Sequence, residues 1–437
     1  MPTQIFLAST LYGTATLAAG IDAGSFPPAG RRILLTSNHS VTAEVSPGVA
    51  DMPGFAALRT RFDEVLDWNR VIAPQHPSTW APRTEDVPLW ERQLRTLWGL
   101  GEDRVELIVE SLQVPPAQTL CRLFPGAAVD VYADGLMSYG PTRFRLDAQL
   151  GMRVRRVLHL DLVPGLEPLL LTEFAVPAEL VPAEPFLKVL AELPAHDTGL
   201  DGIGGSPALL LGQYLSALDL MSPDEEEELH VSMVRGAHAR GHTELVFKPH
   251  PSAPAAYSRR AQAEAERLGA RLTVIDGPLL AEALYQRLNP ALVVGCFSTG
   301  LLTAATLYGL PVARTGTEAI LARLAPYPNS NRIPLTLVDA LVPDLADPRG
   351  TAGEAPADLA ALVTAVGFTM QPNVLAARRP AAEAYLAGHL TDRTRRYFTR
   401  RRLTALGLPG GIPAGLSFLP RSRAVRRVAR RLRRALG

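Results

Sequence analysis

A histidine held between two prolines is the residue whose surroundings point most directly to chemistry. Residues 246–251 read Val-Phe-Lys-Pro-His-Pro, and each proline fixes its own backbone angle and restricts the residue before it. His250 therefore lies in a constrained loop after an expected strand, at the edge where open α/β sheets bind ligands. Its imidazole can donate to a phosphate or to a leaving oxygen. A turn histidine that only stabilises the loop fits the same pattern. The neighbouring Lys248 favours the phosphate interpretation, because lysine is rare in this arginine-rich chain and Lys188 is the only other one.

Two hydroxyl residues form a second candidate. Ser298 and Thr299 follow an expected strand that ends near Gly295, and they begin an expected helix. Hydroxyls and backbone N–H groups at a helix start can hold a phosphate. Serine and threonine are also ordinary helix caps. Their place after His250, in the same alternating block, makes them a candidate second clamp on one nucleotide.

A carboxylate forms the third candidate. Asp134 and Gly135 follow the apolar strand expected at residues 129–132, in the other half of the chain. An aspartate at a strand end can take a proton from an attacking hydroxyl. An Asp-Gly pair is equally a common turn signal. The residue types alone leave both interpretations open.

The composition describes a globular protein of two or three domains. The chain has 437 residues, 47% of them hydrophobic and 20% charged, with a net charge of +1. This balance does not indicate a polyanion partner for the whole molecule, and we expect no nucleic acid. Cys121 and Cys296 show no disulfide or metal spacing, so a reducing compartment is expected. Residues 1–8 read as a strand and lack the pattern of a signal peptide. We therefore expect a cytoplasmic protein.

Strand-like and helix-like stretches alternate along the chain, which predicts mostly parallel sheets covered by helices. In the first half, strands are expected at 4–8, 32–35, 105–109 and 129–132. Helices are expected at 14–23, 55–68 and 88–100, and a further helix ends at 124. In the second block, strands are expected at 209–211, 244–247, 272–275, 292–294 and 335–338, and helices at 223–240, 257–268, 279–288 and 300–308. Residues 164–207, rich in Pro, Gly and acidic residues, are the expected domain boundary.

Residues 290–313 carry no charge and are long enough to span a bilayer. Gly295, Ser298, Thr299, Gly300 and Gly309 interrupt the segment. An apolar run at 292–294 suits a buried strand, and 300–308 suits a buried helix. We therefore expect a strand, a turn and a helix here.

The C-terminal region is rich in arginine. One cluster lies at 393–402, and a second runs through 421–434, where Val425, Val428, Leu432 and Leu436 recur at helical spacing. An apolar stripe beside dense arginine is typical of a helix that lies on an anionic membrane surface. This pattern predicts peripheral contact with the inner face of the cell membrane. Nucleic-acid binding or a disordered basic tail are the alternatives for this segment.

The three candidate elements, in this order, resemble the bacterial alpha-2,8-polysialyltransferase family. Further similar stretches of sequence lie at 4–13, 160–166 and 211–215. The resemblance therefore covers roughly residues 3–330 and leaves out the arginine-rich tail. Bacterial sialyltransferases generally carry an acidic-acidic-Gly motif, a His-Pro motif and a Ser/Thr pair. His250 and the Ser298–Thr299 pair match. Asp134 matches in part, since Ala133 replaces the first acid.

The resemblance implies an α/β fold of GT-B type, with two Rossmann-like domains facing across a cleft. We expect an acceptor-side domain at 1–205, a nucleotide-sugar domain at 206–365, helices at 366–405 that cross back to the first domain, and a basic tail at 406–437. It also implies inverting transfer of a sialic-acid-like sugar from a CMP donor to a glycan acceptor, with no metal and no cofactor.

The resemblance also implies residue roles. Asp134 would be the general base, and His250 would stabilise the phosphate or leaving group. Lys248, Ser298, Thr299, Gly212 and Asp276 are assigned to the nucleotide. Arg143 is assigned to the sugar carboxylate, and Glu44 is a second candidate on the sugar side or as base. A capsule-type Kdo transferase, a polyol-phosphate transferase, a non-hydrolysing epimerase and an inactive glycan-binding relative remain alternatives.

Overall fold

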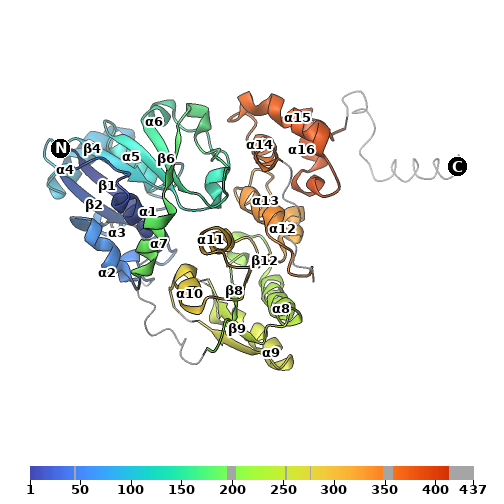
Figure 1. Ribbon diagram of the computed structural model, residues 1–437. Helices are drawn as coiled ribbons and strands as arrows, with labels where there is room; N and C mark the ends of the chain where they lie inside the picture. The colour runs from blue at the N-terminus through green and yellow to red at the C-terminus, as the bar shows by residue number, and fades with distance from the viewer. Residues whose placement is uncertain (44–45, 194–202, 251–252, 276, 348–357, 413–437) are drawn as a thin grey trace.

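The computed structural model describes residues 1–43, 46–193, 203–250, 253–275, 277–347 and 358–412. Within them the chain forms two parallel sheets, each covered by helices (Figure 1). Glu44, Asp276 and the arginine-rich segment 421–437 lie outside the described residues. The fold class expected from the sequence, two Rossmann-like α/β units, is confirmed. The domain boundaries proposed above stay predictions.

The first sheet has seven strands in the order β3-β2-β1-β4-β5-β6-β7, all paired in parallel. They are β1 (Thr3–Ala8), β2 (Arg31–Thr36), β3 (Glu64–Asp67), β4 (Val105–Val109), β5 (Ala128–Ala133), β6 (Val154–Leu160) and β7 (Ala178–Val181). Strands β1 and β4 are buried along their whole length, since helices cover both faces of a parallel sheet.

The second sheet has five parallel strands in the order β10-β9-β8-β11-β12. They are β8 (Ala208–Leu211), β9 (Glu244–Lys248), β10 (Arg271–Val274), β11 (Leu292–Gly295) and β12 (Val312–Arg314). The central strand β8 reads Ala-Leu-Leu-Leu and is fully buried. In both sheets the strand order reverses beside the first strand, and ligands bind at such a point.

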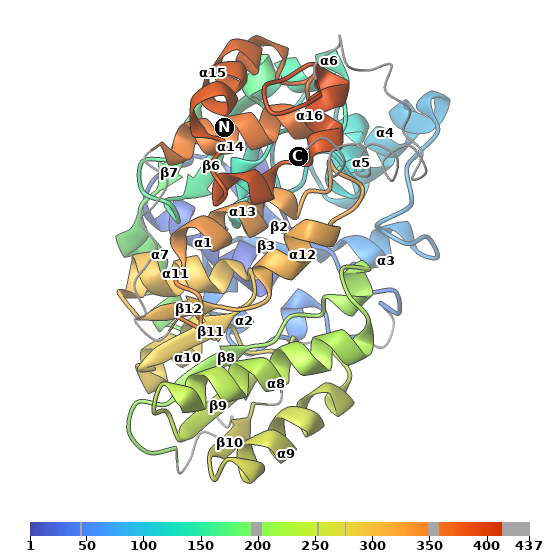
Figure 2. The same cartoon turned by 90° about the vertical axis from the view of Figure 1, so that its right-hand side faces the viewer.

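The helices connect the strands and close the chain. They are α1 (Leu11–Asp22), α2 (Phe55–Leu58), α3 (Trp68–Ile72), α4 (Val87–Leu97), α5 (Ala117–Leu123), α6 (Ala148–Met152), α7 (Ala183–Ala191), α8 (Pro223–Ala239), α9 (Arg259–Arg267), α10 (Ala281–Leu288), α11 (Thr299–Tyr308), α12 (Thr317–Arg323), α13 (Arg332–Leu341), α14 (Leu359–Met370), α15 (Arg379–His389) and α16 (Arg400–Leu406). Figure 2 shows α14, α15 and α16 at the end of the molecule opposite α8 and α9.

Two predicted elements are wrong. The helix expected at 55–68 ends after α2 in a 3₁₀ turn, and the chain then forms β3, which pairs with β2. The strand expected at 335–338 is part of α13. A short apolar run cannot be assigned to strand or helix by its pattern alone, and nearly all of α13 is buried. The boundary expected at 164–207 also contains β7 and α7.

The uncharged segment 290–313 forms β11, a turn and α11, as predicted. Gly309 ends α11 with a φ of 64°, a left-handed conformation that glycine adopts without strain. Among the described residues, no helix is long and apolar enough to cross a membrane.

Helix α14 contacts the first part of the chain. Gln371, which follows it, donates from Nε2 to the backbone oxygen of Arg143 at 2.7 Å. A Cβ atom on Gly367 would lie 2.7 Å from the side chain of Leu169, so the helix packs closely on that segment. The chain that follows the second sheet therefore also contacts the unit built on the first sheet.

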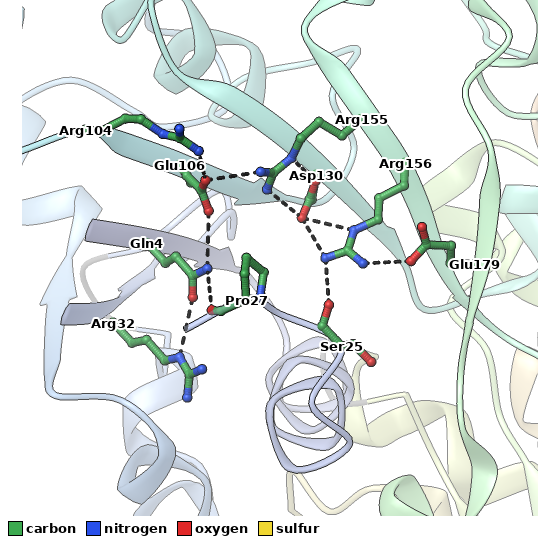
Figure 3. A network of polar contacts seen from close by, with 10 residues as sticks. All are labelled: Gln4, Ser25, Pro27, Arg32, Arg104, Glu106, Asp130, Arg155, Arg156 and Glu179. Carbon is green, nitrogen blue, oxygen red and sulfur yellow. Dashed lines mark hydrogen bonds and ion pairs between the residues drawn. The ribbon is translucent and has the colours of Figure 1, made fainter. Parts of the chain in front are cut away.

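A buried ion network holds the amino-terminal halves of β4, β5 and β6 together (Figure 3). Asp130 is fully buried and accepts hydrogen bonds of 2.8–3.1 Å from Arg155 and Arg156. Arg155 also reaches Glu106 at 3.1 Å, and Arg156 reaches Glu179 at 2.7 Å. Both buried carboxylates, Glu106 and Asp130, are thus paired with arginines of β6, and burial of charge requires such pairing.

This network predicts a large loss of folding stability when its central carboxylate is removed. Asp130→Asn leaves two arginines without their shared partner and should lower the free energy of unfolding by about 3 kcal/mol. Glu383→Gln, which breaks the exposed pair with Arg379, is the control and should cost less than about 0.5 kcal/mol. Urea unfolding followed by circular dichroism measures both. Equal small losses in the two variants would contradict a central role for Asp130.

Candidate active site

A cavity of about 800 Å³ lies where strand ends of both sheets meet. Its lining includes residues that follow β4, β5, β8, β9 and β11, the strand ends at which parallel α/β sheets bind ligands. The cavity brings together these sequence-predicted site residues: Asp134, Arg143, Gly212, His250, Ser298 and Thr299. Their roles in a reaction are taken up below as proposals.

Asp134 lies beside the first turn of α1. Thr10 caps this helix, because its Oγ1 accepts a hydrogen bond from the Gly13 amide at 2.9 Å. A Cβ atom on Gly13 would lie 3.3 Å from Asp134 Oδ2, so the carboxyl group sits directly against this turn. Burial raises the pKa of Asp134, while hydrogen bonds from its own backbone and from Thr10 oppose the rise. The positive end of the helix dipole also favours the ionised form.

Glu110 is a second carboxyl group in the cavity, and the sequence analysis missed it. It follows β4 as Asp134 follows β5, and Tyr132 donates to its Oε2 at 3.2 Å. Burial and then the charge of Asp134 raise the pKa of Glu110 to about 7, against hydrogen bonds from Ser9 and Tyr132. Its position after a buried strand was the available signal, because the same argument found Asp134.

His250 extends from the loop after β9 into the cavity, where the ring of Tyr214 lies 6.4 Å away between centroids. Burial and then the charge of Lys248 lower the pKa of His250, and Glu226 opposes them. Gly212 lets β8 approach this loop. Its amide donates to the Lys248 oxygen at 2.9 Å, and a Cβ atom there would lie 3.1 Å from Pro249 Cα.

Lys248 does not line the cavity. Its side chain is buried behind the wall, where its Nζ donates to the Pro249 oxygen at 3.5 Å. Burial lowers the pKa of Lys248 and Glu282 on α10 opposes this. Glu282 is buried in turn, which raises its pKa to about 7 in spite of its own backbone amide and Lys248. The expected contact between Lys248 and a phosphate stays a prediction.

Ser298 and Thr299 begin α11 at the opposite wall. Ser298 caps the helix by accepting from the Gly300 amide at 3.2 Å. Thr299 Oγ1 lies 3.5 Å from the amide of Leu136, and a Cβ atom on Gly135 would lie 3.2 Å from it. The Thr299 hydroxyl therefore faces the loop that carries Asp134.

Arg143 is the arginine of the cavity lining. Its amide donates to Gln113 Oε1, and its backbone oxygen accepts from Gln371. The segment after β4 and the end of α14 thus hold its backbone in place. Its guanidinium contacts the sulfur of Met137 at 2.7 Å and has no ion-pair partner among the residues described. Burial lowers the pKa of Arg143, and an anion in the cavity would compensate for this burial.

Further lining residues come from parts of the chain that the sequence analysis did not single out. His39 stands in the loop after β2, and burial and then His76 lower its pKa. Gln213 follows β8 and accepts from the Phe297 amide at 2.9 Å, which ties the ends of β8 and β11 together. Asn331 and Gln371 reach the cavity from the segments around α13 and α14.

Comparison with known families gives a match over most of the chain. The model of a family described as alpha-2,8-polysialyltransferase (POLYST) matches residues 4–317, which include every sequence-predicted site residue. No protein with a curated description matches the chain in sequence.

Solved structures with a similar arrangement are distant in sequence. The chain is 11% identical to a UDP-GlcNAc 2-epimerase from Neisseria meningitidis bound to UDP-GlcNAc, with a TM-score of 0.43, covering 76% of this chain and 85% of that one. It is 11% identical to the UDP-GlcNAc 2-epimerase of Methanocaldococcus jannaschii, with a TM-score of 0.40 and coverages of 72% and 83%. MurG of Acinetobacter baumannii is 11% identical, with a TM-score of 0.38 and coverages of 87% and 94%.

Proposed function

Because the chain belongs to the alpha-2,8-polysialyltransferase family, we propose that it transfers a sialic-acid-like sugar from a CMP donor to a glycan acceptor, with inversion and without a metal. Membership of the family makes it a glycosyltransferase. The observation that carries the finer proposal is the cavity, which holds Asp134 from the first sheet and His250 from the second. Transfer needs a base on the acceptor and a stabilising group on the leaving phosphate.

The second sheet supplies the nucleotide side of the proposed site. His250, Ser298 and Thr299 line the cavity together, and hydroxyls at the start of α11 suit a phosphate. Gly212 keeps the wall close to the His250 loop. Arg143 is our candidate for the sugar carboxylate, because a guanidinium without an ion pair can bind a carboxylate bidentately.

The reaction is a single displacement. Asp134 takes the proton of the acceptor hydroxyl as its oxygen attacks the anomeric carbon. The bond from that carbon to the phosphate oxygen breaks through an oxocarbenium-like state, and CMP leaves with the bonding electrons. One displacement inverts the anomeric centre.

His250 acts where negative charge develops. Because burial and Lys248 lower its pKa, the free protein holds a neutral imidazole, which still has one N–H to donate. A bound phosphate accepts this N–H, and the hydrogen bond strengthens as negative charge develops on the leaving phosphate.

A donor screen tests the proposal. CMP and CMP-sialic acid should raise the midpoint temperature of unfolding, since a ligand that binds only the folded state stabilises it. CDP-glycerol and UDP-GlcNAc, at the same concentration, should leave it unchanged. Selective stabilisation by CDP-glycerol or by UDP-GlcNAc would replace the CMP donor by that of a polyol-phosphate transferase or an epimerase.

The roles of Asp134 and His250 predict different defects. Asp134→Asn should leave CMP binding nearly unchanged and lower turnover about 100-fold or more, because the base acts on the acceptor. His250→Ala should weaken CMP binding and slow transfer together, because its contact forms with the bound donor and strengthens in the transition state. Calorimetry with CMP and transfer rates with a sialylated acceptor measure both. Normal turnover by Asp134→Asn would remove Asp134 from the mechanism and make Glu44 the next candidate.

We propose that the arginine-rich segment 421–437 binds an anionic membrane surface, on the basis of its sequence alone. A chain that ends at residue 420 should no longer sediment with vesicles containing phosphatidylglycerol, while its transfer to a soluble acceptor stays normal. Equal sedimentation of both chains would exclude this role. Equally tight binding of the full chain to DNA would mean that charge alone is responsible.

A further inference from the structure

Two adjacent strand ends of the first sheet each bring a carboxyl group to the cavity. Strands β4 and β5 are paired in parallel with Val109 opposite Val131, so both leave the sheet at the same edge. Glu110 follows β4 and Asp134 follows β5, and both line the cavity. Ala133 leaves no acid directly before Asp134, and the second carboxyl comes from the neighbouring strand instead.

The surroundings of the two carboxyl groups differ. Asp134 lies against the capped first turn of α1, which favours its anion. Glu110 lies at no helix start and is next to the charge of Asp134. Besides Ser9, its hydrogen-bond donor is the hydroxyl of Tyr132, whose single proton is divided between the Leu7 oxygen at 3.0 Å and Glu110 Oε2 at 3.2 Å. A shared proton stabilises a carboxylate less than an undivided one. The geometry therefore favours one anion at Asp134 and a neutral acid at Glu110.

The charges of the lining give this difference a consequence. Among the described lining residues, the acids are Glu110 and Asp134, and the other ionisable side chains are Tyr132, Tyr214, Arg143, His39 and His250. Ser9 after β1, the helix cap Thr10 and Tyr12 on α1 also interact with this pair. When Glu110 is neutral, the negative charge of Asp134 and the positive charge of Arg143 balance. When Glu110 is ionised, the cavity wall has a net negative charge.

We propose that Glu110 is a positioning residue for the donor, whose neutral form lets a dianionic nucleotide sugar approach the base Asp134. The inference rests on the proposed function, because a CMP-activated acidic sugar carries one charge on the phosphate and another on the sugar carboxylate. Two adjacent carboxylates would repel it in a cavity of low dielectric constant. Neutral Glu110 avoids this repulsion without removing the anion that takes the acceptor proton.

The proposal predicts where activity is lost as the pH rises. The pKa of Glu110, raised to about 7, makes it neutral at pH 6 and ionised at pH 8.5. In the wild-type protein, kcat/KM for the donor should therefore fall about 20-fold between pH 6.5 and pH 8.5, as expected for one ionising group. The fall should appear in KM for the donor, and kcat should change little.

Three variants test this assignment in initial-rate measurements from pH 6 to pH 9. In Glu110→Gln, an amide keeps the shape without the charge, so KM for the donor should vary less than about threefold across this range. Tyr132→Phe removes the hydrogen bond that stabilises the Glu110 anion and should move the loss to higher pH. Glu173→Gln is the matched control, because burial also raises the pKa of Glu173 but its side chain lies outside the cavity lining.

The outcomes separate this inference from the proposed function. An unchanged alkaline loss in Glu110→Gln, or its disappearance in Glu173→Gln, would overturn the role of Glu110. A loss of turnover at every pH in Glu110→Gln, with normal CMP binding, would make Glu110 an ionised base and also overturn it. If Glu110→Gln does not fold, an unshifted profile in Tyr132→Phe overturns it instead. Failure of the wild-type protein to bind CMP or transfer sugar would refute the proposed function itself.

Discussion

The candidate active site depends on the close contact between the first turn of α1 and the end of β5. Gly13 makes this contact possible, since a Cβ atom there would lie 3.0 Å from Tyr132 Oη and 3.3 Å from Asp134 Oδ2. The same turn contacts the second unit, because Tyr12 Oη lies 3.5 Å from Thr303 Oγ1 on α11. A single helical turn thus positions the carboxylate and joins it to the helix that begins with Ser298 and Thr299.

This contact also makes the two carboxyl groups of the cavity unequal. Burial raises the pKa of both Asp134 and Glu110, so burial alone does not distinguish them. The helix start and the Thr10 hydroxyl act on Asp134. Glu110 accepts from Ser9 and shares the hydrogen bond of Tyr132, but it has no helix start and experiences the charge of Asp134. Two carboxyl groups in different surroundings can hold different protonation states at one pH. The packing of α1 therefore decides which of them carries the charge.

The sequence predicted the parts of the site that follow strands with clear apolar patterns. Asp134, His250 and Ser298 were found because each follows such a strand, and parallel strand ends meet at one edge. Glu110 follows an equally clear strand, but no glycine or proline stands next to it to mark a turn. Asn331 and Gln371 could not be predicted, because their place depends on how α13 and α14 pack. The strand predicted at 335–338 is wrong because a short apolar run is compatible with either a strand or a helix.

Lys248 was singled out from the sequence but lies outside the cavity lining. Its rarity in an arginine-rich chain suggested a direct phosphate ligand, yet the side chain lies behind the cavity wall with Glu282. From there it still acts on the site, because its charge lowers the pKa of His250 further than burial alone does. Glu282, with a pKa raised to about 7 by its own burial, is only partly ionised at neutral pH and neutralises this charge incompletely. The buried lysine thus adds to burial in lowering the pKa of the histidine, an effect through space that no linear motif can express.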